Sequence, residues 1–285
     1  MSEILQNCSS DQGLVLLYHA VFENLPEELD GSLHNVTPNQ LRLQLQAVAR
    51  RFEFVSVDDF SRLENPAGFA AVSFDDGYRC VLEQALPIFE ELKIPFTLYV
   101  NGGAFDGSAN WRDKIRYLES RDLTKKFESE MRGITPVAGK RFYRYSKSAL
   151  NNSQVVDKEL DRFLSCLDLL PTLSEFLLSN LNELPVHPLI HYGNHSHNHY
   201  VLSSLNSSEI ERQIRLTHGL LSDLPDKQIS RWFSVPFGDL CDFDSRTSGI
   251  IRKLGYAGCL LSRYRSHHRE LEVHGAPAIE RLMPR

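Results

Sequence analysis

The residues of this chain that are best suited to chemistry form a histidine cluster in the segment 193–199, which reads Gly-Asn-His-Ser-His-Asn-His. His195 and His199 are four positions apart, so a helix beginning here would carry both imidazole rings on one face. Two imidazoles at that spacing can hold one metal ion, whereas His197 would point elsewhere. The spacing therefore predicts that His195 and His199 are metal ligands and that His197 is not.

Two neutral imidazoles leave coordination positions open, so a carboxylate from another segment has to complete the site. Asp75 and Asp76 are candidates, because they follow the apolar run 69–74 and precede Gly77. Taken alone, an acidic pair before glycine is more typical of a turn. Adjacent strand residues point to opposite sides, but the chain bends where a strand ends. One carboxylate can then bind a metal while the other faces the water that attacks the substrate.

The elements that must position these residues alternate between short apolar runs and helical patterns. Strands are expected at residues 14–18, 54–57, 69–74, 95–100, 187–192, 231–235 and 255–260. Helices are expected at 38–49, 79–92, 208–224 and 248–254, the third opened by a capping box at 208–211. This alternation, with continuous rather than alternating apolar strands, predicts an α/β fold with a parallel sheet covered on both faces.

Residues 106–185 break this rhythm, because the segment is richer in charge and has polar connections between expected helices such as 158–169 and 173–181. We interpret it as a helical insertion into one domain that spans residues 1–285. Such an insertion could be a lid over the site or the surface through which a homo-oligomer forms.

The polar candidates all follow expected strands. They are His19, the pair Asp75 and Asp76, the pair His195 and His199, and the turn Pro236-Phe237-Gly238. In barrel-like α/β folds the carboxyl ends of the strands converge on one face, and active sites are built there. The chain order therefore predicts that these groups meet at one end of a barrel.

Composition narrows the class of protein. The chain has 285 residues, 42% of them hydrophobic and 24% charged, as is ordinary for a globular protein. Its net charge of -6 argues against sequence-independent binding of nucleic acid. No run approaches the roughly 18 apolar residues of a membrane helix, and residues 1–12 lack a secretory pattern. With five scattered cysteines and no CxxC pair, we expect free thiols and a cytoplasmic location.

Together these motifs resemble those of the NodB-homology polysaccharide deacetylases, carbohydrate esterase family 4. The family's first motif, Thr/Ser-Phe-Asp-Asp-Gly, corresponds to residues 73–77, and its second, His-Ser/Thr-x-x-His, to residues 195–199. The third, Arg-x-Pro-Phe/Tyr-Gly, is matched only in part by residues 234–238. The resemblance covers about residues 14–105 and 186–261 and leaves out the helical segment.

The resemblance implies a distorted (β/α)7 barrel and a metal-dependent hydrolase that removes the N-acetyl group of an amino sugar. It assigns Asp76, His195 and His199 to the metal and makes Asp75 the catalytic base. Zinc is the expected ion, although Co, Ni, Mn or Fe accept the same donors.

The resemblance also gives roles to backbone groups near the metal. An N–H near Gly77 or Tyr78 would help to hold the oxyanion. Pro236, Phe237 and Gly238 would shape and orient the substrate site.

Two departures from the family pattern need replacements. Ser234 stands where the family has the arginine that orients the base, and we hypothesise that Arg281 supplies that charge. The family's acid histidine ends a C-terminal Leu-x-His strand, but His267, His268 and His274 lie in polar or mixed segments. Residues 16–19, Leu-Leu-Tyr-His, have that pattern at the other end of the chain, as in a circularly permuted subgroup. His19 is therefore the predicted catalytic acid.

The predicted function is removal of an acetyl, or a formyl, group from an amino sugar in surface-glycan or polysaccharide biosynthesis, on a substrate such as a nucleotide- or lipid-linked precursor. Hydrolysis of another amide on the same scaffold is an alternative, because fold and metal do not fix the substrate. A degenerate carbohydrate-binding protein is a second alternative. Ser234 favours it, and the intact set of Asp75, Asp76, His195 and His199 opposes it.

Overall fold

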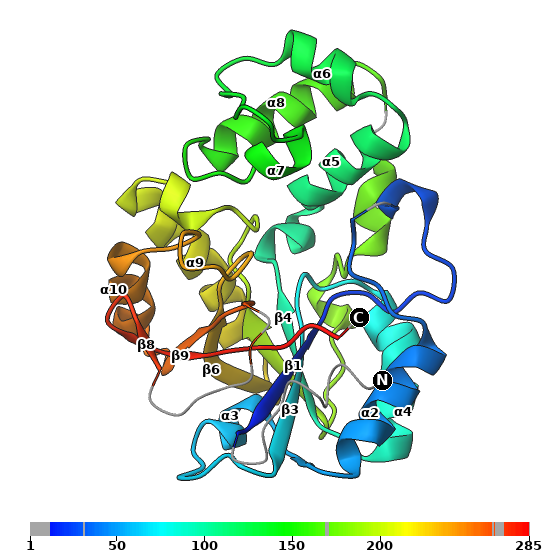
Figure 1. Ribbon diagram of the computed structural model, residues 1–285, viewed down its shortest axis with the longest axis vertical. Coiled ribbons are helices and arrows are strands. Elements are labelled where there is room, and N and C mark those ends of the chain that lie inside the picture. Colours follow the sequence, from blue (N-terminus) through cyan, green and yellow to red (C-terminus); the bar gives the residue numbers. More distant parts are fainter. Residues whose placement is uncertain (1–11, 31, 169–170, 264, 266–270, 285) are drawn as a thin grey trace.

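A curled sheet forms the centre of the protein (Figure 1). The computed structural model describes residues 12–30, 32–168, 171–263, 265 and 271–284. Neighbouring strands follow the order β1-β3-β4-β5-β6-β7-β9, all parallel, with β8 antiparallel to β9 and β2 beside β3. The expected α/β class and barrel-like architecture are confirmed.

The strands are short and mostly buried, as their apolar runs predict. They are β1 (Leu14–Tyr18), β2 (Glu53–Phe54), β3 (Phe69–Phe74), β4 (Phe96–Val100), β5 (Ile190–Asn194), β6 (Gln228–Ser234), β7 (Gly258–Leu260), β8 (Glu272–Val273) and β9 (Ala276–Ile279). The barrel helices are α2 (Pro38–Ala49), α3 (Val57–Phe60), a π-helical turn (Val81–Ala85) that continues into α4 (Leu86–Leu92), α9 (Ser207–Ser222) and α10 (Ser245–Lys253).

The C-terminal segment returns to the first strand. Sequence reasoning found no strand after β7, but β9 lies parallel to β7. Beyond β9, the Leu17 N–H donates to the Leu282 carbonyl (2.9 Å) and the Leu282 N–H donates to the Val15 carbonyl (2.8 Å). A four-residue strand that contains Pro277 is too short to show a pattern, which is why it was missed. His267 and His268 lie outside the described residues.

The helical segment stands over the carboxyl ends of the strands, at the top of Figure 1. It contains α5 (Trp111–Ser120), α6 (Thr124–Glu130), α7 (Phe142–Tyr145) and α8 (Ser153–Ser165). Its apolar side chains join a cluster with barrel residues such as Phe233 and Val235. The expected helix at 173–181 is wrong, because only a 3-10 turn (Pro171–Phe176) forms before Leu177 bridges to Tyr78.

Side-chain caps moved two other expected boundaries. Helix α9 starts after Asn206, whose side chain accepts the Glu209 N–H (2.9 Å), and not at a Ser208 capping box. The strand expected at 54–57 stops early, because the Ser56 hydroxyl accepts the Asp59 N–H (3.0 Å) and begins α3. In the described part of the chain, every helix is too short or too polar to cross a membrane.

Candidate active site

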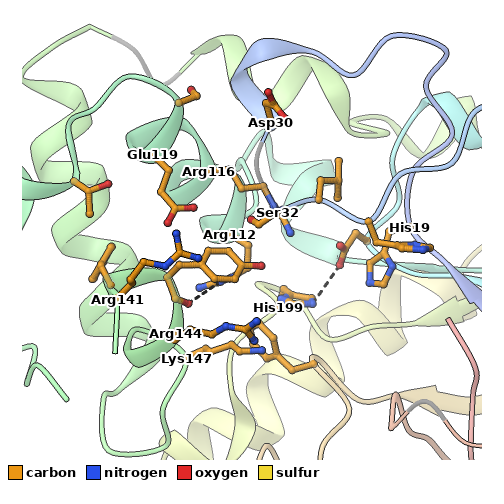
Figure 2. Close-up of a pocket in the computed structure, with 18 of the residues that line it drawn as sticks. His19, Asp30, Ser32, Arg112, Arg116, Glu119, Arg141, Arg144, Lys147 and His199 are labelled. Atoms are coloured by element: carbon orange, nitrogen blue, oxygen red, sulfur yellow. Dashed lines mark hydrogen bonds and ion pairs between the residues drawn. The ribbon is translucent and has the colours of Figure 1, made fainter. Parts of the chain in front are cut away.

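The carboxyl ends of four strands deliver polar groups to one cavity of about 1620 Å³. His19 follows β1, Asp75 and Asp76 follow β3, His195 and His199 follow β5, and Phe237 follows β6. All of these residues line the cavity. The helical segment contributes the opposite wall, so the site lies between the barrel and α5–α7 (Figure 2).

The histidine pair lies on a loop and not on a helix, so that expectation is wrong. Ser196 and His199 have left-handed backbone angles, with φ of 65° and 56°. The Asn194 side chain accepts the Ser196 N–H (2.8 Å), and the Ser196 hydroxyl accepts the His199 N–H (3.1 Å). These local bonds replace helical ones. The two histidine rings still meet, with centroids 4.8 Å apart.

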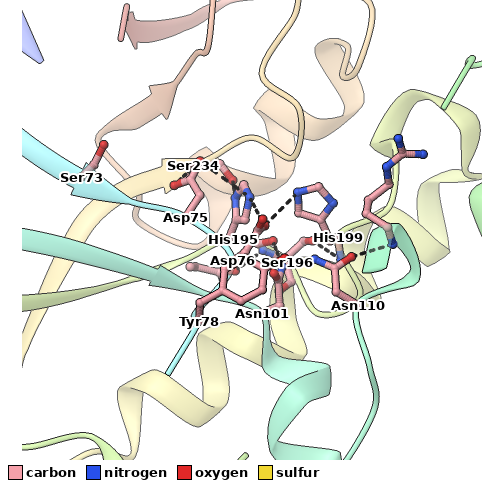
Figure 3. A network of polar contacts seen from close by, with 12 residues as sticks. Ser73, Asp75, Asp76, Tyr78, Asn101, Asn110, His195, Ser196, His199 and Ser234 are labelled. Atoms are coloured by element: carbon pink, nitrogen blue, oxygen red, sulfur yellow. Dashed lines mark hydrogen bonds and ion pairs between the residues drawn. The ribbon is translucent and has the colours of Figure 1, made fainter. Parts of the chain in front are cut away.

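Asp76, His195 and His199 form a buried group whose donor atoms converge (Figure 3). Asp76 Oδ1 lies 3.4 Å from His195 Nε2 and 3.2 Å from His199 Nε2. Among the described residues, neither Asp76 Oδ1 nor His195 Nε2 has a hydrogen-bond partner. Ligands that share a zinc ion at about 2.0–2.2 Å lie about 3–3.5 Å from one another. The group therefore fits a divalent cation.

The protonation states of the group suit a metal. His195 Nδ1 lies 2.9 Å from the Ser234 carbonyl, which can only accept, so Nδ1 carries a proton and Nε2 is the atom that would face a metal ion. Burial lowers the pKa of His195, but Asp75 and Asp76 raise it by more, so the negative charges here favour a positive charge at Nε2. Burial lowers the pKa of His199 to about 3, which leaves a neutral imidazole at neutral pH. Burial by itself raises the pKa of Asp76, but the neighbouring His199 and His195 lower it by more than that. The net pKa lies below its ordinary value, so the carboxyl is ionised.

Asp75 is held by Arg281 and Ser234. The Arg281 guanidinium donates to both carboxylate oxygens (2.9 and 2.7 Å), and the Ser234 hydroxyl lies 3.0 Å from each. Burial raises the pKa of Asp75, but the charge and hydrogen bonds of Arg281, together with His195 and His19, outweigh it, so the pKa lies below its ordinary value. Arg281 is fully buried and also donates to the Leu261 carbonyl (2.9 Å). The structure thus brings Arg281 and Ser234 together on the same carboxylate, as the hypothesis that Arg281 supplies the missing charge requires.

His19 lies at the edge of the same group. Its Nδ1 is buried and has no hydrogen-bond partner among the described residues. Burial lowers the pKa of His19, while the negative charges of Asp76 and Asp75 oppose the shift. The ring packs edge-on against His34, with centroids 5.8 Å apart. His19 is therefore available to move a proton within the cavity.

Several predicted residues act through the backbone. Tyr78 turns its hydroxyl away from the cavity and donates to Asp113 on α5 (2.7 Å). Gly77 and Phe237 have positive φ, 77° and 65°, and the Phe237 ring lies 4.6 Å from the His199 ring. At Gly238, with φ of 73°, a Cβ would come within 2.6 Å of the Ser262 nitrogen. The positive φ at Gly77 and Gly238 therefore favours glycine at both positions, and at Gly238 a side chain would also collide with the backbone.

Sequence reasoning missed two residues that hold the histidine loop. The Asn101 amide, after β4, donates to the His195 carbonyl (2.6 Å). The Trp111 indole, on α5, donates to the His199 carbonyl (2.8 Å). The Asn-Gly-Gly turn at 101–103 gave a signal, but nothing in the sequence linked Trp111 to a loop 88 positions away. The helical segment therefore supports the site directly.

The sequence model of the family described as "Polysaccharide deacetylase" matches residues 62–146, which include β3 and both aspartates of the site. Over these residues, which make up less than half of the chain, the protein is similar to polysaccharide deacetylases. This similarity indicates a hydrolase of the carbohydrate N-deacetylase kind. The match runs beyond β4 into α5 and α7, so the deacetylase resemblance extends into the segment that the motif comparison left out. No curated protein matches the chain.

Solved deacetylase structures share the fold. "Streptococcus pyogenes deacetylase PplD in complex with acetate" has a TM-score of 0.58 at 16% identity, over 97% of this chain and 93% of that one. The "Structure of IcaB from Ammonifex degensii" has a TM-score of 0.52 at 17% identity, over 96% and 92%. A de-N-acetylase from Aggregatibacter actinomycetemcomitans gives 0.53 at 13%, over 95% and 94%. At these identities the likeness shows the fold alone.

Proposed function

We propose that the protein is a metal-dependent deacetylase that hydrolyses the N-acetyl group of an amino sugar in glycan or polysaccharide biosynthesis. One observation carries this proposal: a buried Asp76–His195–His199 group stands beside a second carboxylate, Asp75, which Arg281 holds ionised. A metal-binding group with an adjacent base is what hydrolysis of an unactivated amide requires.

Each residue near the group has a proposed part in the reaction. A divalent ion bound to the three ligands would lower the pKa of water and polarise the amide carbonyl. Asp75 accepts the proton of the attacking water, and Arg281 keeps its carboxylate facing that proton. The β-bridge between Tyr78 and Leu177 consists of two backbone hydrogen bonds, in which the Gly77 carbonyl accepts the Leu178 N–H and the Arg79 N–H donates to the Phe176 carbonyl. The Tyr78 N–H takes no part in this bridge, so we assign it to the oxyanion.

His19 is the proposed proton donor to the departing sugar amine. Because burial lowers the pKa of His19, its ring is neutral before the reaction and has to receive a proton during turnover. The proton that Asp75 takes from the attacking water is available in the same cavity. We expect His19→Asn to lower kcat by about a hundredfold or more while metal content stays at the wild-type level. His187→Asn, before β5 at the opposite end of the strand, is the control. Full turnover by His19→Asn would assign the acid to another group.

Metal binding is tested without reference to activity. We expect the metal-stripped protein to take up one zinc ion per chain. His199→Gln should bind zinc about a hundredfold or more weakly, because losing even a group that only hydrogen-bonds to a metal ligand lowers affinity about 10–100-fold. His197→Gln is the matched control, because His197 pairs with Asp106 (3.0 Å) and lies outside the group. Equal zinc affinity in all three proteins, measured by competition with a chelator, would contradict the assignment.

Acetate release from N-acetylated sugars separates the proposal from its alternatives. Release with added zinc supports the deacetylase, and metal binding without release from any sugar favours another amide or a binding function. The single domain with an insertion, the homo-oligomer through the helical segment, the cytoplasmic location and the circular permutation stay predictions. So does the choice of zinc over Co, Ni, Mn or Fe.

A further inference from the structure

The helical segment lines the cavity with cations that the deacetylation mechanism does not use. Arg112, Arg144 and Lys147 lie on the wall next to His199 (Figure 2). Arg112 comes from α5, Arg144 from α7, and Lys147 follows α7. We call these three residues the cationic wall.

Arg112 carries a buried charge that no carboxylate of the described residues neutralises; after burial, the largest influence on its pKa is the Tyr143 phenol, which raises it. Only 2% of the residue is exposed, and no carboxylate pairs with its guanidinium within the described residues. It donates to the Ser146 hydroxyl and the Tyr143 carbonyl (3.0 Å each) and stacks on the Tyr143 ring at 4.1 Å. A guanidinium has five N–H donors, so these two bonds leave others unused. A buried, unpaired charge is costly unless a partner of opposite sign neutralises it.

Lys147 is a second residue of the cationic wall that no carboxylate pairs with in the described part of the chain, and its side chain is half-buried. Its ammonium lies over the Phe237 ring at 5.0 Å. Burial lowers the pKa of Lys147, and the nearby charge of Arg112 lowers it further. Asp242 acts on Lys147 electrostatically, and Glu119 acts on Arg112. In the described part of the chain neither carboxylate forms an ion pair with these cations.

Tyr143 reports the electrostatic potential at the cationic wall. Burial raises the pKa of its hydroxyl, but Arg112 and Arg116 lower it to about 7. A phenol shifted this far marks a place where negative charge is stabilised.

Phe237 places the cationic wall relative to the catalytic group. On one side the Phe237 ring meets the His199 ring at 4.6 Å. The same ring lies 5.6 Å from the Arg112 guanidinium and 5.0 Å from the Lys147 ammonium. Arg112 and Lys147 therefore share the Phe237 ring as a neighbour with the predicted metal ligand His199. An N-acyl sugar at the metal group would hold a substituent on that sugar against them.

From this arrangement, which rests on the proposed deacetylase function for the sugar's orientation, we propose that the substrate is an N-acylated amino sugar that carries a phosphate group, and that Arg112, Arg144 and Lys147 bind the phosphate. Three positive charges are more than the single negative charge of a carboxylate can neutralise, which favours phosphate. The planar guanidinium groups also match the geometry of phosphate oxygens. The phosphate belongs either to a nucleotide or to a lipid carrier, and both present the same chemistry to the cationic wall.

The test compares two substrates that differ only in the phosphate. We expect wild-type protein to hydrolyse N-acetylglucosamine 1-phosphate with a kcat/KM at least tenfold above that for the neutral methyl glycoside. Lys147→Gln and Arg144→Gln should raise KM for the phosphate substrate about fivefold or more and leave the neutral substrate unchanged. Lys158→Gln is the matched control, because it removes an exposed lysine of α8 outside the cavity. Equal efficiency on both substrates would overturn the proposal.

A binding measurement separates this proposal from the deacetylase function. Calorimetric titration with inorganic pyrophosphate needs no hydrolysis. Weaker binding by Lys147→Gln and Arg144→Gln, but not by Lys158→Gln, supports the phosphate site even if no N-acetyl sugar is cleaved. Binding that is absent, or equal in all four proteins, overturns it. UDP-N-acetylglucosamine and a short-chain prenyl diphosphate N-acetylglucosamine then distinguish the nucleotide from the lipid carrier by their kcat/KM.

Discussion

Asp75→Asn is expected to lower kcat for acetate release by about a thousandfold, within the range of loss of a positioned general base. The amide keeps the shape of the carboxylate but cannot take a proton from the attacking water. Zinc affinity should stay within a few-fold of wild type, because Asp76, His195 and His199 are unchanged. The measurement is a paired determination of kcat and zinc content on the same preparation.

A matched control for this substitution is Asp58→Asn. Asp58 is also buried, but it accepts the Arg231 N–H (2.9 Å) and lines no part of the catalytic cavity. We expect its kcat to remain within a few-fold of wild type. If Asp75→Asn kept most of its turnover with a full complement of zinc, Asp75 would not be the base.

Arg281→Met is expected to reduce both stability and turnover. The side chain is fully buried and forms two bonds to Asp75, so its removal leaves a buried carboxylate without its arginine counter-charge and with the Ser234 hydroxyl as its remaining hydrogen-bond donor. Breaking a buried ion pair in this way costs about 3–5 kcal/mol of unfolding free energy. Turnover should fall because Asp75 loses the group that orients it. Urea unfolding and kcat measure the two effects.

The double variant Asp75→Asn with Arg281→Met gives the control. Each single substitution leaves one buried partner unpaired, whereas the double removes both. We therefore expect the double variant to be more stable than the sum of the two losses predicts, by about 0.5–3 kcal/mol. Additive losses would mean that the contact between Arg281 and Asp75 does not stabilise the fold.

The pH dependence of Arg281→Met has a definite sign. In the wild-type protein Arg281 holds the pKa of Asp75 below its ordinary value against the effect of burial. The ionised Asp75 then stabilises the fold above its unfolded-state pKa, and this contribution is lost as pH falls through the folded-state pKa. Without Arg281, burial is opposed less and the Asp75 pKa rises. The acid limb of the pH–kcat profile should therefore move to higher pH, and the stability deficit should shrink toward acid pH.

The sequence identified the candidate catalytic groups better than it identified the structure around them. Asp75, Asp76, His195 and His199 were selected by type and by their place after apolar runs, and the structure puts all four in one buried group. The geometry assumed for the histidines was wrong, because the loop of Ser196 and His199 depends on side-chain bonds and left-handed angles. A spacing of four positions suits both a helix and this loop.

The chain's own sequence determined its α/β class, most of its strand positions and the residues of the candidate metal group, because these follow from local hydrophobic patterns and short motifs. Only the tertiary structure decided that Arg281 donates two hydrogen bonds to Asp75 and that the Trp111 indole donates to the His199 carbonyl. It also decided that Arg112 and Lys147 face the cavity. These contacts join residues up to 206 positions apart. Such pairs leave no local pattern, since the curvature of the sheet and the packing of the helical segment bring them together.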